Sequence, residues 1–272
     1  MKCIVISENS SMEGLGSEWG LSFYIEHEGW NFLVDAGASG LFLKNAEKLN
    51  IDIGNVSAAM LSHAHYDHAR GMRSFFEANK SAAFYLSGAA TENCYSKHFI
   101  IKKYIGIDKG ILAEFEDRIN YCSELTEVCG GSVFVLPHYK MPVSGTKSMY
   151  VKGQMGYEKD TFRHEQSIIF LLGTEEKREL VVFSPCSHLG VPTIIEEVRE
   201  QFPGIPIKAL LGGFHLFTKS KGYIEDLAGR MAQLGIEKIY TGHCTGDRAY
   251  NILEEQLGER LYKLTAGLVI EL

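Results

Sequence analysis

The 272-residue sequence predicts an α/β protein, an αββα sandwich of two mixed β-sheets with helices on the outer faces. Both halves of the chain begin with paired β-rich runs and continue into alternating strands and helices. The hydrophobic content of 45% can supply a large core, and the charged content of 22% is ordinary for a folded protein. Chains of this length commonly form one α/β domain, so we expect residues 1–272 to fold as a single domain.

The elements of the first half follow from apolar spacing and from glycine. A spacing of two residues predicts strands, a spacing of three to four predicts helices, and Gly29 marks a hairpin between two strands. The expected elements are strands at 2–7, 21–26 and 30–35, a helix at 41–49, a strand at 58–62, a helix at 71–78 and a strand at 82–86.

The second half repeats this order after two stretches without a clean period. Residues 92–128 and 138–165 are expected to be insertions that cover the substrate, the first with one or two helices over a cleft. The elements expected around them are strands at 133–136, 167–172 and 180–183 with a turn at 173–177, a helix at 191–201, a strand at 207–211, a helix at 224–234, a strand at 238–240, a helix at 250–257 and a closing strand at 268–272.

Charge and hydropathy narrow the class of partner. The net charge of -7 gives no overall attraction to a phosphate backbone, and pairs such as Lys102-Lys103 are interpreted as a solvated face. No run approaches the roughly 20 apolar residues that span a bilayer, and the N-terminus lacks a signal peptide's apolar stretch. We therefore expect a cytoplasmic protein with a small-molecule substrate, no nucleic-acid partner and no membrane partner. The sequence leaves the oligomeric state open.

The strongest chemical signal is a cluster of four metal-binding residue types directly after the strand at 58–62. His63, His65, Asp67 and His68 fall within six positions. In an extended backbone alternate side chains share a face, so the first three can converge while His68 points toward a second location. Imidazole and carboxylate are natural ligands for zinc, iron or manganese. A solvated histidine-rich loop is the alternative, but so dense a cluster in a chain with ten histidines favours a metal site.

The segment His63-Ala-His65-Tyr-Asp67-His68 resembles the H-x-H-x-D-H motif of the metallo-β-lactamase superfamily. Leu33-Val-Asp35-Ala-Gly37 is similar to the upstream aspartate motif of that superfamily. The resemblance implies the metallo-β-lactamase fold and two metal ions, one bound by the H-x-H pair and the other by the D-H pair. It also implies that Asp35 supports the loop from behind, either close to the metal or through its ligands.

Three later motifs resemble one branch, the dihydropterin–ribofuranosylaminobenzene phosphate synthase-like proteins, over nearly the whole chain. They are Cys186-Ser-His188, Gly212-Gly-Phe-His215-Leu and Tyr240-Thr-Gly-His243-Cys244, and each follows an apolar strand. The resemblance implies that His188 and His243 are metal ligands, with His243 on the second metal. His215 is expected either to bind metal or to donate a hydrogen bond to substrate, as a catalytic residue.

Other positions leave alternatives open. Cys186 is either a thiolate that bridges the metals or a buried thiol that packs the turn. The branch usually has paired aspartates where this chain has His164-Glu165, and Glu165 is expected to keep a carboxylate role toward substrate. Lys219 and Lys221 follow His215 and are expected to bind a peripheral anion of the substrate.

The chemistry that the resemblance implies is hydrolysis. Two divalent ions, zinc or else iron or manganese, would activate a hydroxide, with Asp67 as a metal ligand that also orients the nucleophile. The expected substrate is a small anion, phosphorylated in the favoured case. The alternatives are a pterin-transferring synthase that displaces pyrophosphate, and a metal-dependent ligand-binding or sensor protein without turnover. A flavodiiron-type oxygen reductase is disfavoured because His65 stands where such sites prefer glutamate and no flavodoxin domain follows.

Overall fold

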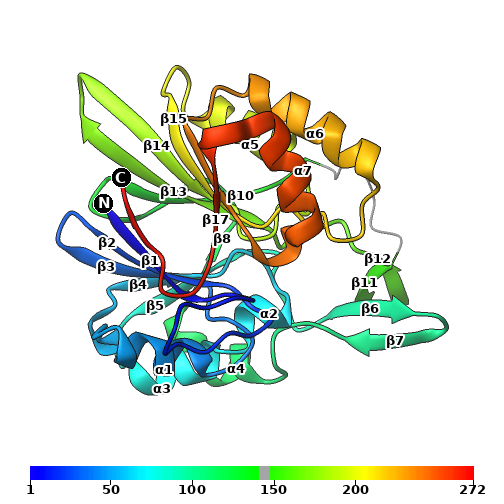
Figure 1. Ribbon diagram of the computed structural model, residues 1–272. Coiled ribbons are helices and arrows are strands. Elements are labelled where there is room, and N and C mark those ends of the chain that lie inside the picture. The colour runs from blue at the N-terminus through cyan, green and yellow to red at the C-terminus, as the bar shows by residue number, and fades with distance from the viewer. Residues whose placement is uncertain (141–147) are drawn as a thin grey trace.

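Two seven-stranded sheets pack face to face and form the αββα sandwich that the sequence predicts (Figure 1). The computed structural model describes residues 1–140 and 148–272. The first sheet has the order β18-β1-β2-β3-β4-β5-β8. Its strands are β1 (Lys2–Ser7), β2 (Ser22–His27), β3 (Trp30–Val34), β4 (Ala58–Met60), β5 (Ala83–Ser87), β8 (Ile119–Cys122) and β18 (Val269–Glu271). Strands β3, β4, β5 and β8 run parallel, and the others pair antiparallel.

The second sheet has the order β17-β16-β15-β14-β13-β10-β9. Its strands are β9 (Thr126–Cys129), β10 (Val133–Pro137), β13 (Gln166–Thr174), β14 (Lys177–Phe183), β15 (Ile207–Gly212), β16 (Lys238–Thr241) and β17 (Leu261–Lys263). Strands β14 to β17 run parallel, so their carboxyl ends meet at one edge of the sheet. Both sheets are mixed, as expected.

Helices cover the outer face of each sheet (Figure 1). Apolar residues of α1 and α3 pack on the first sheet, and those of α5, α6 and α7 pack on the second. The helices are α1 (Leu41–Lys48), α2 (Tyr66–Ala69), α3 (Met72–Ala78), α4 (Ile111–Glu114), α5 (Val191–Gln201), α6 (Lys221–Gln233) and α7 (Asp247–Leu257). Short 3₁₀ turns are η1 (Ile53–Asn55), η2 (Glu116–Arg118), η3 (His243–Thr245) and η4 (Gly258–Arg260). A third apolar cluster, which includes Phe23 and Phe170, fills the space between the sheets.

The two expected hairpins are present. Strands β2 and β3 pair from Phe23 to Val34, and only Glu28 and Gly29 lie between them. Both connecting residues have positive φ, 48° and 83°, as a tight two-residue hairpin turn requires. The second hairpin joins β13 to β14, with Thr174 opposite Lys177. Glycine at position 29 therefore identified the first turn correctly.

The stretch from 92 to 128 differs from the prediction. Its helices are single turns, and most of it forms strands: β6 (Cys94–His98), β7 (Ile101–Tyr104), β8 and β9. Strands β8 and β9 extend the two main sheets, so the insertion expected over 92–128 is shorter than its predicted range. The stretch does contain one short helix and one 3₁₀ turn, but its strands were not predicted, because strands paired to distant segments carry no clear local period.

A small third sheet projects from one side of the sandwich (Figure 1). It joins β6 and β7 to β11 (Met149–Gly153) and β12 (Gly156–Lys159), in the order β12-β11-β6-β7. The two stretches expected to be insertions, 92–128 and 138–165, thus meet in space through strands that pair with each other. Positions 141–147 of the second stretch lie outside the described residues.

Within the described residues, no helix is both long enough and apolar enough to cross a membrane.

The interface between the sheets predicts a large effect of a core truncation. Phe170 on β13 is fully buried, and its ring meets Phe32 and Phe183 at centroid distances of 5.5 Å each. Phe170→Ala should lower the free energy of unfolding by about 3–5 kcal/mol, measured by chemical denaturation, because it leaves a cavity between the sheets. Met155→Ala, at a side chain that is 99% exposed, is the matched control and should change stability by less than about 0.5 kcal/mol. Equal stability of the two variants would contradict this packing.

Candidate metal centre

The metal-capable residues gather where parallel strands end. The loop after β4 carries His63 and His65, and the loops after β14, β15 and β16 carry His188, His215 and His243. Carboxyl ends of parallel strands meet at one edge of a sheet, and the two sheets bring their edges together here. Residues far apart in sequence therefore face one another in a single site.

The local conformation of the histidine loop differs in part from the expectation. Backbone at His65 is extended, but α2 begins at Tyr66, so Asp67 and His68 lie on a helical turn. The alternating pattern thus holds for His63 and His65 alone. The ring of His68 lies 4.3 Å from that of His63, centroid to centroid, and its Nε2 faces Nε2 of His243 at 3.2 Å.

Three histidines form the first group of candidate ligands. The ring centroids of His63, His65 and His188 are 4.6–4.9 Å apart, and their ligand atoms lie within 4.8 Å of one another. Nε2 of His65 is buried and lies 4.0 Å from Oδ2 of Asp160. Nε2 of His63 and both ring nitrogens of His188 are also buried, and none of these three has a hydrogen-bond partner in the described part of the chain. Buried polar atoms are normally satisfied, so these nitrogens fit a cation.

The protonation states of these histidines also fit a cation. Burial lowers the pKa of His65 to about 3, and burial together with repulsion from neighbouring imidazoles holds the pKa of His63 and of His188 well below the ordinary value. All three rings are therefore neutral at pH 7. A neutral imidazole has the lone pair that binds a metal ion.

Asp67, His68 and His243 form the second group. Nε2 of His243 lies 3.2 Å from Nε2 of His68 and 3.4 Å from Oδ2 of Asp67. Burial alone would raise the pKa of Asp67, but the hydrogen bond to His243 and the nearby His68 hold it well below its usual range. Asp67 is therefore ionised and supplies the negative charge that a divalent cation requires.

Hydrogen bonds behind the ligands hold their rings in place. Asp35, fully buried, accepts from the backbone N–H and the hydroxyl of Ser62 at 2.7 Å each and contacts Nδ1 of His68 at 2.6 Å. The Ser62 hydroxyl also meets Nδ1 of His63 at 2.9 Å, and Nδ1 of His243 meets Oδ1 of Asn9 at 3.1 Å. Each contact occupies Nδ1 and leaves Nε2 facing the centre.

Backbone strain is concentrated in the same place. Asp35, Ser187, His215 and His243 all have φ between 41° and 59°, a region that residues other than glycine rarely occupy. Such conformations cost free energy and persist where surrounding contacts enforce them. Here the strained residues carry or adjoin candidate ligands.

Cys186 and Cys244 lie at the floor of the site. Both are buried free thiols, their sulfurs 3.1 Å apart, and the backbone N–H of His215 donates to Sγ of Cys244. Sγ of Cys186 lies within 4.8 Å of candidate ligand atoms in three separate groups. Both alternatives for Cys186, bridging ligand or packing thiol, remain consistent with this position. His215 places its ring 4.4 Å from that of His188, and its buried Nδ1 is unpartnered among the described residues.

The residues expected to bind substrate lie differently. Glu165 is buried, and its two carboxylate oxygens accept from the backbone N–H groups of His188 and Leu189, so it holds the turn that carries His188. Nζ of Lys221 lies 3.5 Å from Glu225, on α6. Lys219 stacks its Nζ on the Tyr223 ring at 5.0 Å. These three residues do not line the cleft beside the metal-capable residues.

That cleft has a volume of about 520 Å³ and presents an unexpected basic wall. Its floor contains His65, Asp67, His188, His215, Cys186 and Cys244. Arg70, which directly follows α2, and Lys103 of the third sheet line one side. Trp19 and Phe217 line another side. Lys103 is exposed, as a solvated face predicts, but it borders this cleft. A larger and more open hollow of about 720 Å³ around Trp30 contains none of the predicted site residues.

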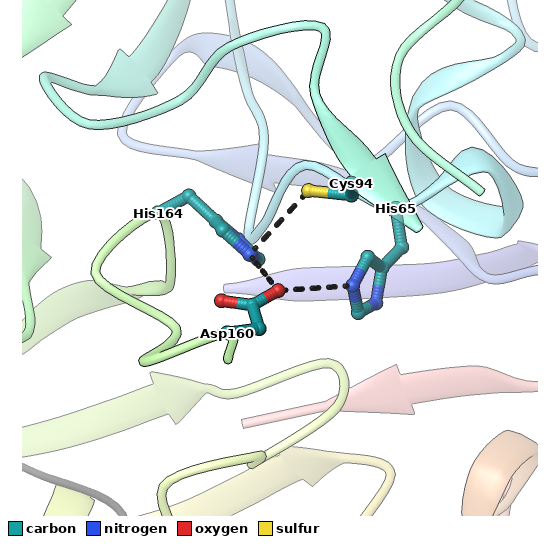
Figure 2. A group of neighbouring side chains, drawn as sticks. All are labelled: His65, Cys94, Asp160 and His164. Carbon is teal, nitrogen blue, oxygen red and sulfur yellow. Dashed lines mark hydrogen bonds and ion pairs between the residues drawn. The ribbon is translucent and has the colours of Figure 1, made fainter. Parts of the chain in front are cut away.

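A further buried group adjoins the site and was missed from the sequence. Asp160, His164 and Cys94 surround the far side of His65 (Figure 2). Cys94 and Asp160 fall in the two stretches where no periodic pattern could place them. The departure at His164 from the expected aspartate was the one available signal.

Comparisons with known proteins agree with this geometry. The model of the metallo-beta-lactamase superfamily matches residues 20–156. A curated relative, the 7,8-dihydropterin-6-methyl-4-(beta-D-ribofuranosyl)-aminobenzene-5'-phosphate synthase of Methanocaldococcus jannaschii, is 26% identical and covers 94% of this chain and 90% of its own. These matches confirm the resemblance found in the sequence, to the superfamily and to the synthase.

Solved structures agree as well. Tm1679, described as a metal-dependent hydrolase of the beta-lactamase superfamily, is 32% identical, covers 100% of this chain and 99% of its own, and has a TM-score of 0.84. The metallo-beta-lactamase fold protein YhfI of Bacillus subtilis is 14% identical with a TM-score of 0.61, covers 99% of each chain, and supports the fold alone.

The contacts of Asp35 predict a specific effect on metal affinity. Asp35→Ala removes the acceptor that orients His68 and Ser62, so affinity for a divalent cation should fall by roughly 10–100-fold. Competition with a chromophoric chelator measures this change. Asp52→Ala, which removes the cap of η1 away from the site, should leave the affinity unaltered. An unchanged affinity in Asp35→Ala would remove Asp35 from the metal centre.

Proposed function

This chain belongs to the metallo-β-lactamase superfamily, and from that membership and the geometry of the site we propose a binuclear metal-dependent hydrolase acting on a small anionic substrate. One observation carries the proposal. The buried, neutral imidazoles of His63, His65 and His188 converge beside the cleft, and nitrogens of His63 and His188 have no hydrogen-bond partner within the part of the chain that the structure describes. Asp67, His68 and His243 form the second group of donors.

The donor set favours zinc. Imidazole, carboxylate and thiol groups are zinc ligands, although iron and manganese bind similar sets. Bound divalent cations lower the pKa of water toward neutrality and polarise an ester or phosphoryl oxygen. His63, His65 and His188 would hold one cation, and Asp67, His68 and His243 the other, with Cys186 between the two groups.

Residues of this chain supply the remaining functions. His215 borders the cleft and has a buried Nδ1 without a partner among the described residues, so it can donate to an oxygen that gains negative charge. Asp67 is ionised and fixed by the indole N–H of Trp19 at 2.9 Å, so it can orient a water molecule as well as bind metal. Trp19 and Phe217 shield this side of the cleft from solvent.

The cleft favours a phosphorylated small molecule. Its volume of about 520 Å³ suits a small molecule, and Lys103 and Arg70, the latter also paired with Asp108 at 3.1 Å, supply positive charge at its side. We further propose that the protein is a single domain, is cytoplasmic, and binds neither nucleic acid nor a membrane. The non-enzymatic alternative is a ligand-binding or sensor protein, which would bind the cation and catalyse no reaction.

A transferase is the second candidate. The synthase of Methanocaldococcus jannaschii aligns over 94% of this chain, and displacement of pyrophosphate needs the same cations as hydrolysis. The low identity of 26% and the His164-Glu165 pair, where the branch has aspartates, favour hydrolysis as the first candidate.

Metal analysis and a substrate panel test the proposal together. Protein purified without chelator should contain about two equivalents of divalent metal by elemental analysis. It should hydrolyse at least one member of a panel of phosphoesters, lactones and thioesters, and Asp67→Ala should abolish that turnover. A folded protein that reproducibly contains no metal would refute the metal centre. Metal without hydrolysis of any panel member, but with transfer to a pterin diphosphate, would favour the synthase.

The position of His215 predicts that metal content and turnover separate. His215→Ala should keep both metal ions and lose about 10²–10³-fold in kcat, the usual effect of deleting one donor to a developing oxyanion. Steady-state kinetics with elemental analysis measures both. His27→Ala, at a buried histidine beside the other hollow, is the control and should keep full turnover. Loss of a metal ion from His215→Ala would instead make His215 a ligand.

A further inference from the structure

Asp160, His164 and Cys94 form a buried polar group against the far side of His65 (Figure 2). Asp160 follows β12, His164 precedes β13, and Cys94 begins β6, so the group joins the third sheet to the sandwich. Nε2 of His164 lies 3.1 Å from Oδ2 of Asp160 and 3.6 Å from Sγ of Cys94. The same Oδ2 lies 4.0 Å from Nε2 of His65.

Hydrogen bonds fix the orientation of the carboxylate. The backbone N–H of Ala64 donates to Nδ1 of His164 at 3.2 Å, so Nδ1 acts as an acceptor and a ring proton lies on Nε2. His164 then donates from Nε2 to Oδ2 of Asp160. The backbone N–H of Phe162 donates to Oδ1 at 2.7 Å. Both oxygens of Asp160 are therefore held, with Oδ2 directed toward His65.

This pattern argues against a cation held by the group itself. Cys94, Asp160, His164 and His65 are all metal-binding residue types within 4.8 Å of one another. A neutral imidazole cannot bind a cation through a protonated nitrogen, and the bond from Ala64 places the proton of His164 on Nε2. The group is better explained as support for His65.

His65 differs from three of the other candidate ligands. His63, His68 and His243 each have a hydrogen-bond partner on Nδ1 and leave Nε2 toward the centre. In His65 the nitrogen beside a possible acceptor is instead Nε2, which is buried and lies 4.0 Å from Oδ2 of Asp160. Its orientation is thus reversed relative to the other three.

We propose that Asp160 is a positioning residue for His65, a step that rests on the proposed metal centre. Oδ2 of Asp160, 4.0 Å from Nε2 of His65, is placed to receive the proton of that nitrogen, which leaves Nδ1 of His65 as the ligand atom. A ring held at both nitrogens has one orientation and a more basic lone pair. Metal-bound histidines almost always have such a partner on the other nitrogen, and a carboxylate is a common one.

His164 adapts this chain to that arrangement. The resembling branch usually has an aspartate at this position, and a second carboxylate so close to Asp160 would repel it. His164 replaces this repulsion with a hydrogen bond to Oδ2 of Asp160. Through Ala64 it also ties Asp160 to the loop that carries His63 and His65.

The zinc affinity of folded variants at Asp160, compared with that of the wild-type protein, tests the assignment. Asp160→Ala should weaken binding of the more tightly held zinc ion by about 10–100-fold in chelator competition, the usual effect of losing such a partner. Asp160→Asn keeps an acceptor oxygen and should give a smaller loss. Glu197→Gln is the matched control, because Glu197 is a buried carboxylate bonded to a histidine, His138, that is not a candidate ligand. It should alter thermal stability without altering zinc affinity.

Several outcomes would overturn the assignment. Wild-type zinc affinity in Asp160→Ala and Asp160→Asn, even with reduced thermal stability, would make the group purely structural. Cys94→Ser should keep zinc stoichiometry and affinity, and loss of one zinc equivalent there would show that the group binds a cation of its own. Wild-type protein that binds no zinc would refute the proposed metal centre and this assignment together. If the wild-type protein showed no turnover but Asp160→Ala still weakened zinc binding, only the hydrolase proposal would be refuted.

Discussion

The buried carboxylate of Asp35 is the contact on which the site depends. It receives the backbone and hydroxyl of Ser62 and the ring of His68, and so joins the end of β3 to both ends of the histidine loop. Its own backbone is strained, with φ of 59°. Packing of both sheets holds this strained residue in place, because β3 lies inside the first sheet and has no freedom to relax.

The burial of so many imidazoles imposes a second constraint. His63, His65 and His188 are buried within a few ångströms of one another, so protonation of any one would be opposed by burial and by its neighbours. The fold thus keeps the lone pairs of these imidazoles free of protons at the centre of the site. Burying such polar nitrogens costs free energy unless a cation binds them. Acidic groups at the periphery, Asp35, Asp67 and Asp160, supply compensating charge from outside this cluster.

The sequence predicted most of the sandwich because its strands and helices have strong local periods. It also predicted that His188, His215 and His243 follow strands, and the structure places all three together. It failed at β6, β7, β11 and β12, whose partners are each other, and therefore at Lys103 and Asp160, which these strands position. Glu165 shows a subtler limit: its residue type suggested contact with substrate, but only the fold reveals that backbone N–H groups occupy both oxygens.

The candidate ligands are spread widely along the chain, from His63 to His243. Contacts between them have a large separation in sequence, and such contacts form late because long loops must close first. During synthesis, at about 5–20 residues per second, the loop with His63 and His65 emerges well before the segments with His188 and His243. Until then, a nascent chain has half a site, whose exposed imidazoles can bind metal without the selectivity of the finished centre. The order of the motifs along the chain thus means that the full set of candidate ligands can assemble only after the segment with His243 has been synthesised.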